Sequence, residues 1–231
     1  MMMEEQQKIK KWFDHTYKKW GFMYLRPLEA YRIFATIINP KPTSKHLDVA
    51  CGLGLLLKAI SVKTKNINGI DLSDQAIEIA QEYCPESTLT QGNAENLPYE
   101  DETFDSISCI GSLERMLDRK KVLAEQRRVG KKEAQFCYMV RNSEHFLWRY
   151  FWKPLGIRNK KGHQDAMNLE EWERLFKSCG FKIVKIYPDH WPYYKIIRAL
   201  IFWKKHDYSR IIKFPGNIRQ AYEFIFLLEK N

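Results

Sequence analysis

A short apolar segment that runs directly into a glycine turn constrains the fold of this chain more than any other feature. Residues 46–54 read His-Leu-Asp-Val-Ala-Cys-Gly-Leu-Gly, and residues 55–60 follow with the apolar character of a buried helix. A strand, a Gly-x-Gly turn and a helix bring backbone N–H groups close to a ligand in an open α/β sheet. A side chain at Gly52 or Gly54 would hold the ligand away from the main chain, so we expect both glycines at the binding site.

The turn favours a nucleoside ligand without a pyrophosphate. A dinucleotide-binding turn has a third glycine where this chain has Leu57. The next strand, over residues 67–70, ends at Asp71, where an acidic residue meets ribose hydroxyls in such folds. A carboxylate there can accept hydrogen bonds from both hydroxyls of a ribose. The alternative is that Asp71 is an exposed loop carboxylate or a helix cap.

Four motifs in order resemble the class I S-adenosylmethionine-dependent methyltransferases, most of all the branch with the ubiquinone and menaquinone methyltransferases. They are Asp48-x-x-Cys51-Gly52-x-Gly54, then Gly69-Ile70-Asp71-Leu72-Ser73, then residues 92–99, then Phe104-Asp105-Ser106-Ile107. The resemblance covers residues 45–187, with a last strand at 223–229. It implies S-adenosylmethionine as cofactor and methyl transfer as the activity. It also implies a three-layer, Rossmann-like α/β fold, whose seven-stranded sheet is mostly parallel with an antiparallel last strand. The alternative is a generic doubly wound domain whose glycines only make turns.

The resemblance also implies which residues bind the cofactor. Besides the two glycines and Asp71, it points to Asp48, Ala50, Leu72, Asn93, Ala94, Glu95, Cys109 and Ile110. Residues 93–95 should face the adenine. Family members often have Asp at position 93, and the side-chain oxygen of Asn93 can still accept from the exocyclic amine. They often have His where this chain has Arg115, so any role of that His is absent here.

We expect one domain with four parts. These are a helical cap over residues 1–42, a cofactor-binding core over 43–187, a lid insertion over 188–222 and a last strand over 223–231. In the core, Asp118 should cap a helix that runs to Val129 and stops at a glycine, and the strand over 136–140 should follow. Asn168 and Glu171 have the spacing of a capping box.

The N-terminal cap carries an aromatic stripe, because Trp12, Phe13, Tyr17 and Trp20 recur at three- and four-residue steps. Such a stripe is more often packing than a binding surface. In the resembling family, however, an N-terminal helical segment closes over cofactor and acceptor, and Phe13-Asp14-x-x-Tyr17 is similar to its start. The resemblance therefore implies that Tyr17 and Tyr24 line the site.

Two long stretches, 141–167 and 188–222, do not belong to the minimal scaffold. Loops longer than ~12–15 residues in a compact domain are usually lids or binding elements. We therefore expect acceptor contacts from His145, Trp191 and Tyr194. A general base is needed only where the acceptor must lose a proton, and His163 is our candidate, with His145 and Glu114 as alternatives. A lone histidine in a loop is otherwise an ordinary surface group. The spacing of His and Cys residues predicts no metal site.

The net charge of +10 lies in the two terminal segments. Residues 1–45 hold nine Lys and Arg against four Asp and Glu, and residues 181–231 hold ten against four. This excess is either a solvated surface or an attraction for an anionic partner. A helix over 193–203 would combine apolar and basic residues. It would pack on the scaffold, or it would lie at a lipid interface.

We therefore expect a small-molecule methyltransferase whose acceptor is anionic or lipid-like, without an obligate protein partner. The basic pI and interleaved aromatic residues leave an RNA methyltransferase as an alternative, although no RNA-binding domain is appended. A non-catalytic protein that binds S-adenosylmethionine is the third interpretation. Five scattered cysteines and the lack of a signal sequence or an apolar span predict a cytoplasmic protein, with peripheral contact at the inner membrane surface as a further expectation.

Overall fold

The computed structural model describes residues 2–147, 149–150, 165–191 and 217–231. The candidate base His163 and the candidate acceptor residue Tyr194 lie outside these residues, as does most of the predicted lid. None of the helices in the described ranges is long and apolar enough to cross a membrane.

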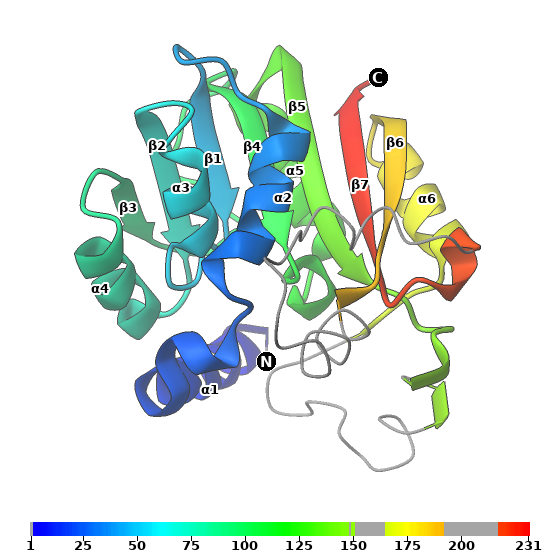
Figure 1. The fold of residues 1–231 in the computed structure, drawn as a ribbon, viewed down its shortest axis with the longest axis horizontal. Coiled ribbons are helices and arrows are strands. Elements are labelled where there is room, and N and C mark those ends of the chain that lie inside the picture. Colours follow the sequence, from blue (N-terminus) through cyan, green and yellow to red (C-terminus); the bar gives the residue numbers. More distant parts are fainter. Residues whose placement is uncertain (1, 148, 151–164, 192–216) are drawn as a thin grey trace, which may run out of the picture.

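The described residues form one seven-stranded sheet in the order β3-β2-β1-β4-β5-β7-β6 (Figure 1). The strands are β1 Lys45–Val49, β2 Asn66–Asp71, β3 Thr88–Gln91, β4 Phe104–Ile110, β5 Gly130–Arg141, β6 Phe181–Asp189 and β7 Glu223–Lys230. The first five pair in parallel, and β7 runs antiparallel to both β5 and β6. The predicted fold, a mostly parallel sheet with an antiparallel last strand, is confirmed.

Helices cover both faces of the sheet, which makes a three-layer fold. The helices of the core are α2 Leu28–Ile38, α3 Leu55–Ile60, α4 Asp74–Tyr83, α5 Arg119–Val129 and α6 Leu169–Ser178. Apolar side chains of α2 and α3 pack in one core cluster, and those of α5 and α6 pack in the cluster on the other face. Because both faces are covered, the central strands β1, β2 and β4 are largely buried, as parallel strands usually are.

The N-terminal cap consists of α1 Met2–Trp20 and a 3₁₀ turn, η1 Gly21–Tyr24, before α2. Helix α1 lies beyond the carboxyl ends of the parallel strands, apart from the layer formed by α2 and α3 (Figure 1). It contacts α4 through the apolar side chains of Phe13 and Tyr17, which pack with Leu53 and Ala76. The cap therefore covers the carboxyl-terminal ends of the strands, where open α/β sheets bind ligands.

Helix α5 ends at Val129 with Gly130 as its C-cap, as predicted, but the left-handed glycine conformation expected there is absent. Gly130 has φ −75° and ψ 142°, an extended conformation that any residue adopts, and β5 begins at this residue. The last carbonyls of α5 instead accept hydrogen bonds from the backbone of Glu102 and Thr103. Gly130 is needed for space, because a Cβ there would lie 2.7 Å from Cζ of Phe136.

The predicted capping box of α6 is confirmed. The Asn168 side chain accepts from the N–H of Glu171 at 2.9 Å, and the Glu171 carboxylate accepts from the N–H of Asn168 at 2.8 Å. From the first turn of α6, the buried indole of Trp172 donates to the carbonyl of Arg141 at 2.9 Å. This bond holds the carboxyl end of β5, where the site is built.

Candidate cofactor and acceptor site

The site lies where the strand order reverses. From β1 the chain continues to β2 on one side, while β4 pairs on the other side of β1, so the loops after β1 and β4 diverge. Ligands bind in the crevice that such a reversal leaves at the carboxyl ends of the strands. Two adjoining cavities occupy this crevice, and both are walled by Phe13 and Tyr17 of α1, Ala50 of the glycine turn, and Ser112 and Arg115 after β4.

The first cavity has a lining suited to a nucleoside. It is an open pocket, with about 550 Å³ of empty space when its mouth is included. Among the predicted cofactor residues, its lining contains Ala50, Asp71, Leu72, Asn93 and Ala94. We name it the nucleoside cavity.

Asp71 is the acidic residue in the described lining of the nucleoside cavity. Its side chain is buried, with the residue 8% exposed, and it accepts hydrogen bonds from the N–H groups of Gly52 at 2.8 Å and Ser73 at 2.9 Å. Burial raises its pKa to about 6, against the effect of these two bonds. Two backbone bonds fix the carboxylate but leave lone pairs for a ribose diol, since each oxygen can accept more than one hydrogen bond.

The glycine turn keeps its main chain open towards the cavities. Ala50, Gly52 and Gly54 all have left-handed φ values, of 59°, 51° and 78°. An alanine in this conformation is strained, and such strain is concentrated at functional sites. A Cβ on Gly52 would lie 3.2 Å from the Tyr17 hydroxyl and would fill the space above the turn. The open turn and the fixed carboxylate fit a nucleoside cofactor.

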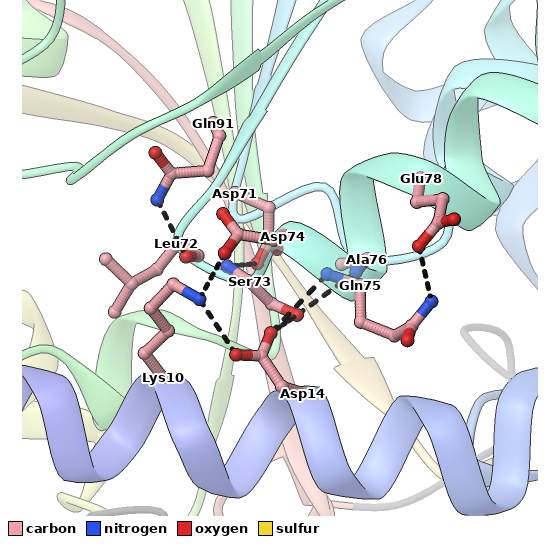
Figure 2. A network of polar contacts seen from close by, with 10 residues as sticks. All are labelled: Lys10, Asp14, Asp71, Leu72, Ser73, Asp74, Gln75, Ala76, Glu78 and Gln91. Atoms are coloured by element: carbon pink, nitrogen blue, oxygen red, sulfur yellow. Dashed lines mark hydrogen bonds and ion pairs between the residues drawn. The ribbon is translucent and has the colours of Figure 1, made fainter.

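A second polar network joins the cap to this site, as Figure 2 shows. The Asp14 carboxylate of α1 accepts from the Ser73 hydroxyl at 2.6 Å and from the Lys10 ammonium at 2.8 Å, while Lys10 also binds Asp74 at 2.6 Å. We name these four residues the cap latch. Although burial opposes it, bonding to Lys10 and Ser73 lowers the pKa of Asp14. Because the Ser73 N–H also binds Asp71, the latch connects α1 to the predicted ribose carboxylate.

The second cavity, which we name the acceptor cavity, continues from the first. Its empty space is about 870 Å³, again including the mouth. Rings of the cap form much of its wall, and the predicted residues Tyr24, Asp48, Gly52 and Ile110 also line it. Burial, with a further effect of Asp71, raises the pKa of Tyr17 well above its ordinary value, so this hydroxyl stays protonated.

Asp48 is part of a buried polar chain that crosses the sheet from β1 to β4. The Ser108 hydroxyl donates to Asp48 at 2.6 Å, and the His46 ring lies between Ser108, at 3.1 Å, and Ser106, at 2.8 Å. Because Ser108 donates to Asp48, its oxygen accepts from Nε2 of His46. Burial raises the pKa of Asp48 to about 7 and lowers that of His46 to about 3, so His46 is neutral. Four polar residues inside two buried strands, two in β1 and two in β4, are the sequence signal for this network.

Five charged residues form an ionic network in the wall of the acceptor cavity. Arg26, which follows η1, binds Asp189 at 2.7 Å and also Glu223. Arg141 lies 3.5 Å from Glu223 and 3.6 Å from Glu114. Arg26, Arg141 and Glu223 line the cavity. Sequence reasoning did not find this network, because its members lie far apart in the chain and belong to no motif.

Some predicted site residues lie outside the described linings of both cavities. Gly54 packs against α4, where its Cβ would meet that of Ala80 at 3.3 Å, so its absent side chain makes room for a helix and not for a ligand. Glu95 accepts from the N–H of Asp118 and so holds the start of α5. Cys109 is fully buried in the apolar core.

Two predicted acceptor residues are also placed elsewhere. His145 is buried beside Tyr222, with ring centroids 5.1 Å apart. Burial, and to a lesser extent His190, lowers the pKa of His145 to about 4, which leaves it neutral. Trp191 packs against Ala30 and Ile33 of α2, and the Arg26 guanidinium lies 5.2 Å from its ring centre. Among the described residues, no group of three or more His, Cys, Asp and Glu is placed to hold a metal.

A Rossmann-like sheet, an open glycine turn and a fixed carboxylate after β2 define a nucleoside-binding α/β protein with a second cavity for an acceptor. A family model described as "Methyltransferase domain" matches residues 47–138. The chain is 28% identical over 176 residues to demethylmenaquinone methyltransferase of Bacillus subtilis, covering 64% of this chain and 76% of that protein. The chain is 30% identical over 176 residues to the Bacillus velezensis enzyme of the same name, again covering 64% of this chain and 76% of that protein.

A solved S-adenosylmethionine-dependent methyltransferase of Thermotoga maritima, described as a possible histamine N-methyltransferase, has the same fold. Its TM-score is 0.68 at 21% identity, over 96% of this chain and 99% of that one. The chain belongs to the class I S-adenosylmethionine-dependent methyltransferases, in the quinone-methyltransferase branch. It is a methyltransferase and its cofactor is S-adenosylmethionine.

Proposed function

We propose that the chain methylates a small-molecule acceptor of anionic or lipid-like character, of the type found in quinone biosynthesis. The acceptor cavity carries this proposal. It adjoins the nucleoside cavity along a shared wall, and it combines aromatic rings of Phe13, Tyr17 and Tyr31 with charged groups. Rings pack on a flat aromatic acceptor, and arginines bind its ionised oxygens. Relatives at about 30% identity are named as demethylmenaquinone methyltransferases, which supports the same substrate class.

In this proposal the nucleoside cavity orients the cofactor. Asp71 binds the ribose hydroxyls, Asn93 and Ala94 contact the adenine, and Asp48 with the open turn at Gly52 faces the amino-acid end. The bound cofactor supplies an activated methyl group on sulfonium. The acceptor would supply the electron pair, from an oxygen or nitrogen lone pair or from the π system of an electron-rich ring carbon that then loses its proton, and S-adenosylhomocysteine would be the leaving group.

The remaining task of the chain is to align the acceptor and exclude water. Holding two reactants in line can lower the barrier by ~7–11 kcal/mol. Tyr17 and Tyr24 of the cap take this part in our proposal, together with the ionic network. We keep His163 as the proposed base for an acceptor that must lose a proton. His145 is not carried forward, because it lies outside the described lining of the acceptor cavity.

The test is methyl transfer from S-[methyl-¹⁴C]adenosylmethionine to three separate substrates: reduced 2-polyprenyl-1,4-naphthoquinone, a lipid extract and total RNA. We expect label in the quinol or lipid fraction and none in RNA. Label in RNA alone would contradict the proposal. Peripheral membrane contact is tested beside it, by co-sedimentation with anionic and neutral vesicles. We expect binding to anionic vesicles only, and its loss in Trp203→Ala.

A further inference from the structure

Arg115 stands where the two cavities meet. It ends the short 3₁₀ turn η2, Leu113–Arg115, directly after β4, and its side chain is among the few that line both cavities. Its guanidinium carbon lies 5.4 Å from the ring centre of Phe13 in the cap. A group at this place would face both a cofactor in the nucleoside cavity and an acceptor in the acceptor cavity.

The guanidinium of Arg115 is also incompletely bonded. Its Nη1 is buried and has no hydrogen-bond acceptor among the residues that the structure describes. A buried donor without an acceptor costs free energy, so such donors in native proteins usually bind something. The other two arginines of the acceptor cavity differ, since Arg26 and Arg141 each face carboxylates of the ionic network.

The charge of the cofactor indicates what Arg115 binds. A sulfonium is a cation, and a guanidinium beside it in a cavity shielded from water is repelled. An anion between the two cations removes this repulsion. Asp48 supplies a carboxylate at the glycine turn, but it lines the acceptor cavity alone, whereas Arg115 lines both cavities. Two anions remain, the carboxylate of the cofactor's own amino-acid end and an ionised oxygen of the acceptor, and measuring S-adenosylhomocysteine affinity alongside acceptor affinity separates them.

We propose, resting on the proposed function, that Arg115 is a specificity-determining residue that binds an ionised oxygen of the acceptor, a phenolate or an aryl carboxylate, at the junction of the two cavities. The planar guanidinium presents several N–H donors to such an oxygen. An opposite charge at hydrogen-bond distance also lowers the pKa of an acidic group. Arg115 thereby selects aromatic acceptors that carry acidic oxygens over neutral ones.

The test measures binding and needs no turnover. The protein is saturated with S-adenosylhomocysteine and titrated calorimetrically with 1-hydroxy-2-naphthoate and with its neutral amide, 1-hydroxy-2-naphthamide. We expect the wild type to prefer the anion by about 10–100-fold, which corresponds to charge-assisted hydrogen bonds. The preference should fall below about threefold in Arg115→Gln and be partly kept in Arg115→Lys.

Arg119→Gln is the matched control. Arg119 lies four residues further on, bonds Asp165 at 3.0 Å and lines neither cavity in the described residues, so the preference should stay at the wild-type value. Lack of an anion preference in the wild type, or its full retention in a folded Arg115→Gln protein, overturns the proposal. A tenfold loss of S-adenosylhomocysteine affinity in Arg115→Gln also overturns it, since Arg115 would then bind the cofactor. Failure of the proposed function would show separately, as absence of label in the quinol and lipid fractions.

Discussion

The sharpest prediction concerns the charge of Asp71. Asp71→Asn keeps the size of the side chain, removes the charge and replaces one acceptor oxygen by an NH₂ group. Hydrogen bonds to a charged group contribute about 1.5–3 kcal/mol. We therefore expect S-adenosylmethionine affinity at pH 8 to fall about 10–100-fold. Because each oxygen of Asp71 also accepts from a backbone N–H, the variant loses one of these bonds and some thermal stability.

The pH dependence separates the charge from the shape of the side chain. Burial raises the pKa of Asp71 to about 6, so the carboxyl takes up a proton as the pH falls below this value. At pH 5 about one carboxyl in ten is ionised, so wild-type affinity should be roughly tenfold lower than at pH 8. Asp48, with a pKa of about 7, titrates in both proteins. Because the charge of Asp71 contributes to the raised pKa of Asp48, the ratio of wild-type to variant affinity reports Asp71 together with its effect on Asp48, and it should shrink at low pH.

Isothermal titration calorimetry between pH 5 and 8 measures this ratio of affinities. S-adenosylhomocysteine, which has the same ribose, should give the same ratio. Asp105→Asn is the matched control: Asp105 lies at the start of β4, at the amino-terminal ends of the parallel strands, where it pairs with Lys131. The cofactor affinity of this variant should stay within about twofold of wild type. An unchanged affinity in a folded Asp71→Asn protein would refute the ribose assignment. A ratio that does not change with pH would refute the role of the charge.

The remaining predictions concern other parts of the site and fold. Gly52→Val puts a branched side chain against the Tyr17 hydroxyl at a φ of 51°, so calorimetry should detect no cofactor binding, and normal affinity would remove the turn from the site. Asp14→Ala opens the cap latch and should speed cofactor dissociation about 2–10-fold in stopped-flow, whereas an unchanged rate would mean that the latch does not hold the cap. Asn168→Ala should lower the free energy of unfolding, measured in urea, by about 0.5–2 kcal/mol and leave cofactor affinity intact. An unchanged urea midpoint would mean that the capping box does not stabilise the fold. His163→Ala should slow methyl transfer at saturating cofactor with little change in cofactor affinity, and equal turnover would make His163 a surface residue.

The sequence was sufficient for features whose cause is local. The strand and glycine turn at residues 46–54, the helix cap at Asp118 and the capping box at Asn168 each depend on residues a few positions apart. The structure has all three where the sequence predicts them. Gly130 shows the limit of such reasoning, because a glycine after a helix serves either to turn the chain or to make room. Only the position of Phe136 distinguishes the two.

The sequence was insufficient where burial and charge are set by the fold. The ionic network joins the end of η1 to the ends of β5 and β6 and the start of β7, and no spacing within the chain indicates that these residues meet. The same holds for Arg115, whose significance lies in a buried nitrogen that has no acceptor among the residues the structure describes. For His145 the residue type suggested an acceptor contact or a general base, but the structure buries its side chain in the packing of the protein.

The position of β7 between β5 and β6 has a consequence for how the protein is made. Residues 223–230 follow β5 and β6 in the chain but separate them in the sheet. During synthesis, the facing edges of β5 and β6 therefore stay unpaired until this last strand leaves the ribosome, and unpaired edges are sites of aggregation. Glu223, at the start of β7, then supplies the carboxylate that binds both Arg26 and Arg141. A nascent chain can thus form its nucleoside-binding half early, while the acceptor wall is completed only after residues 223–230 have left the ribosome.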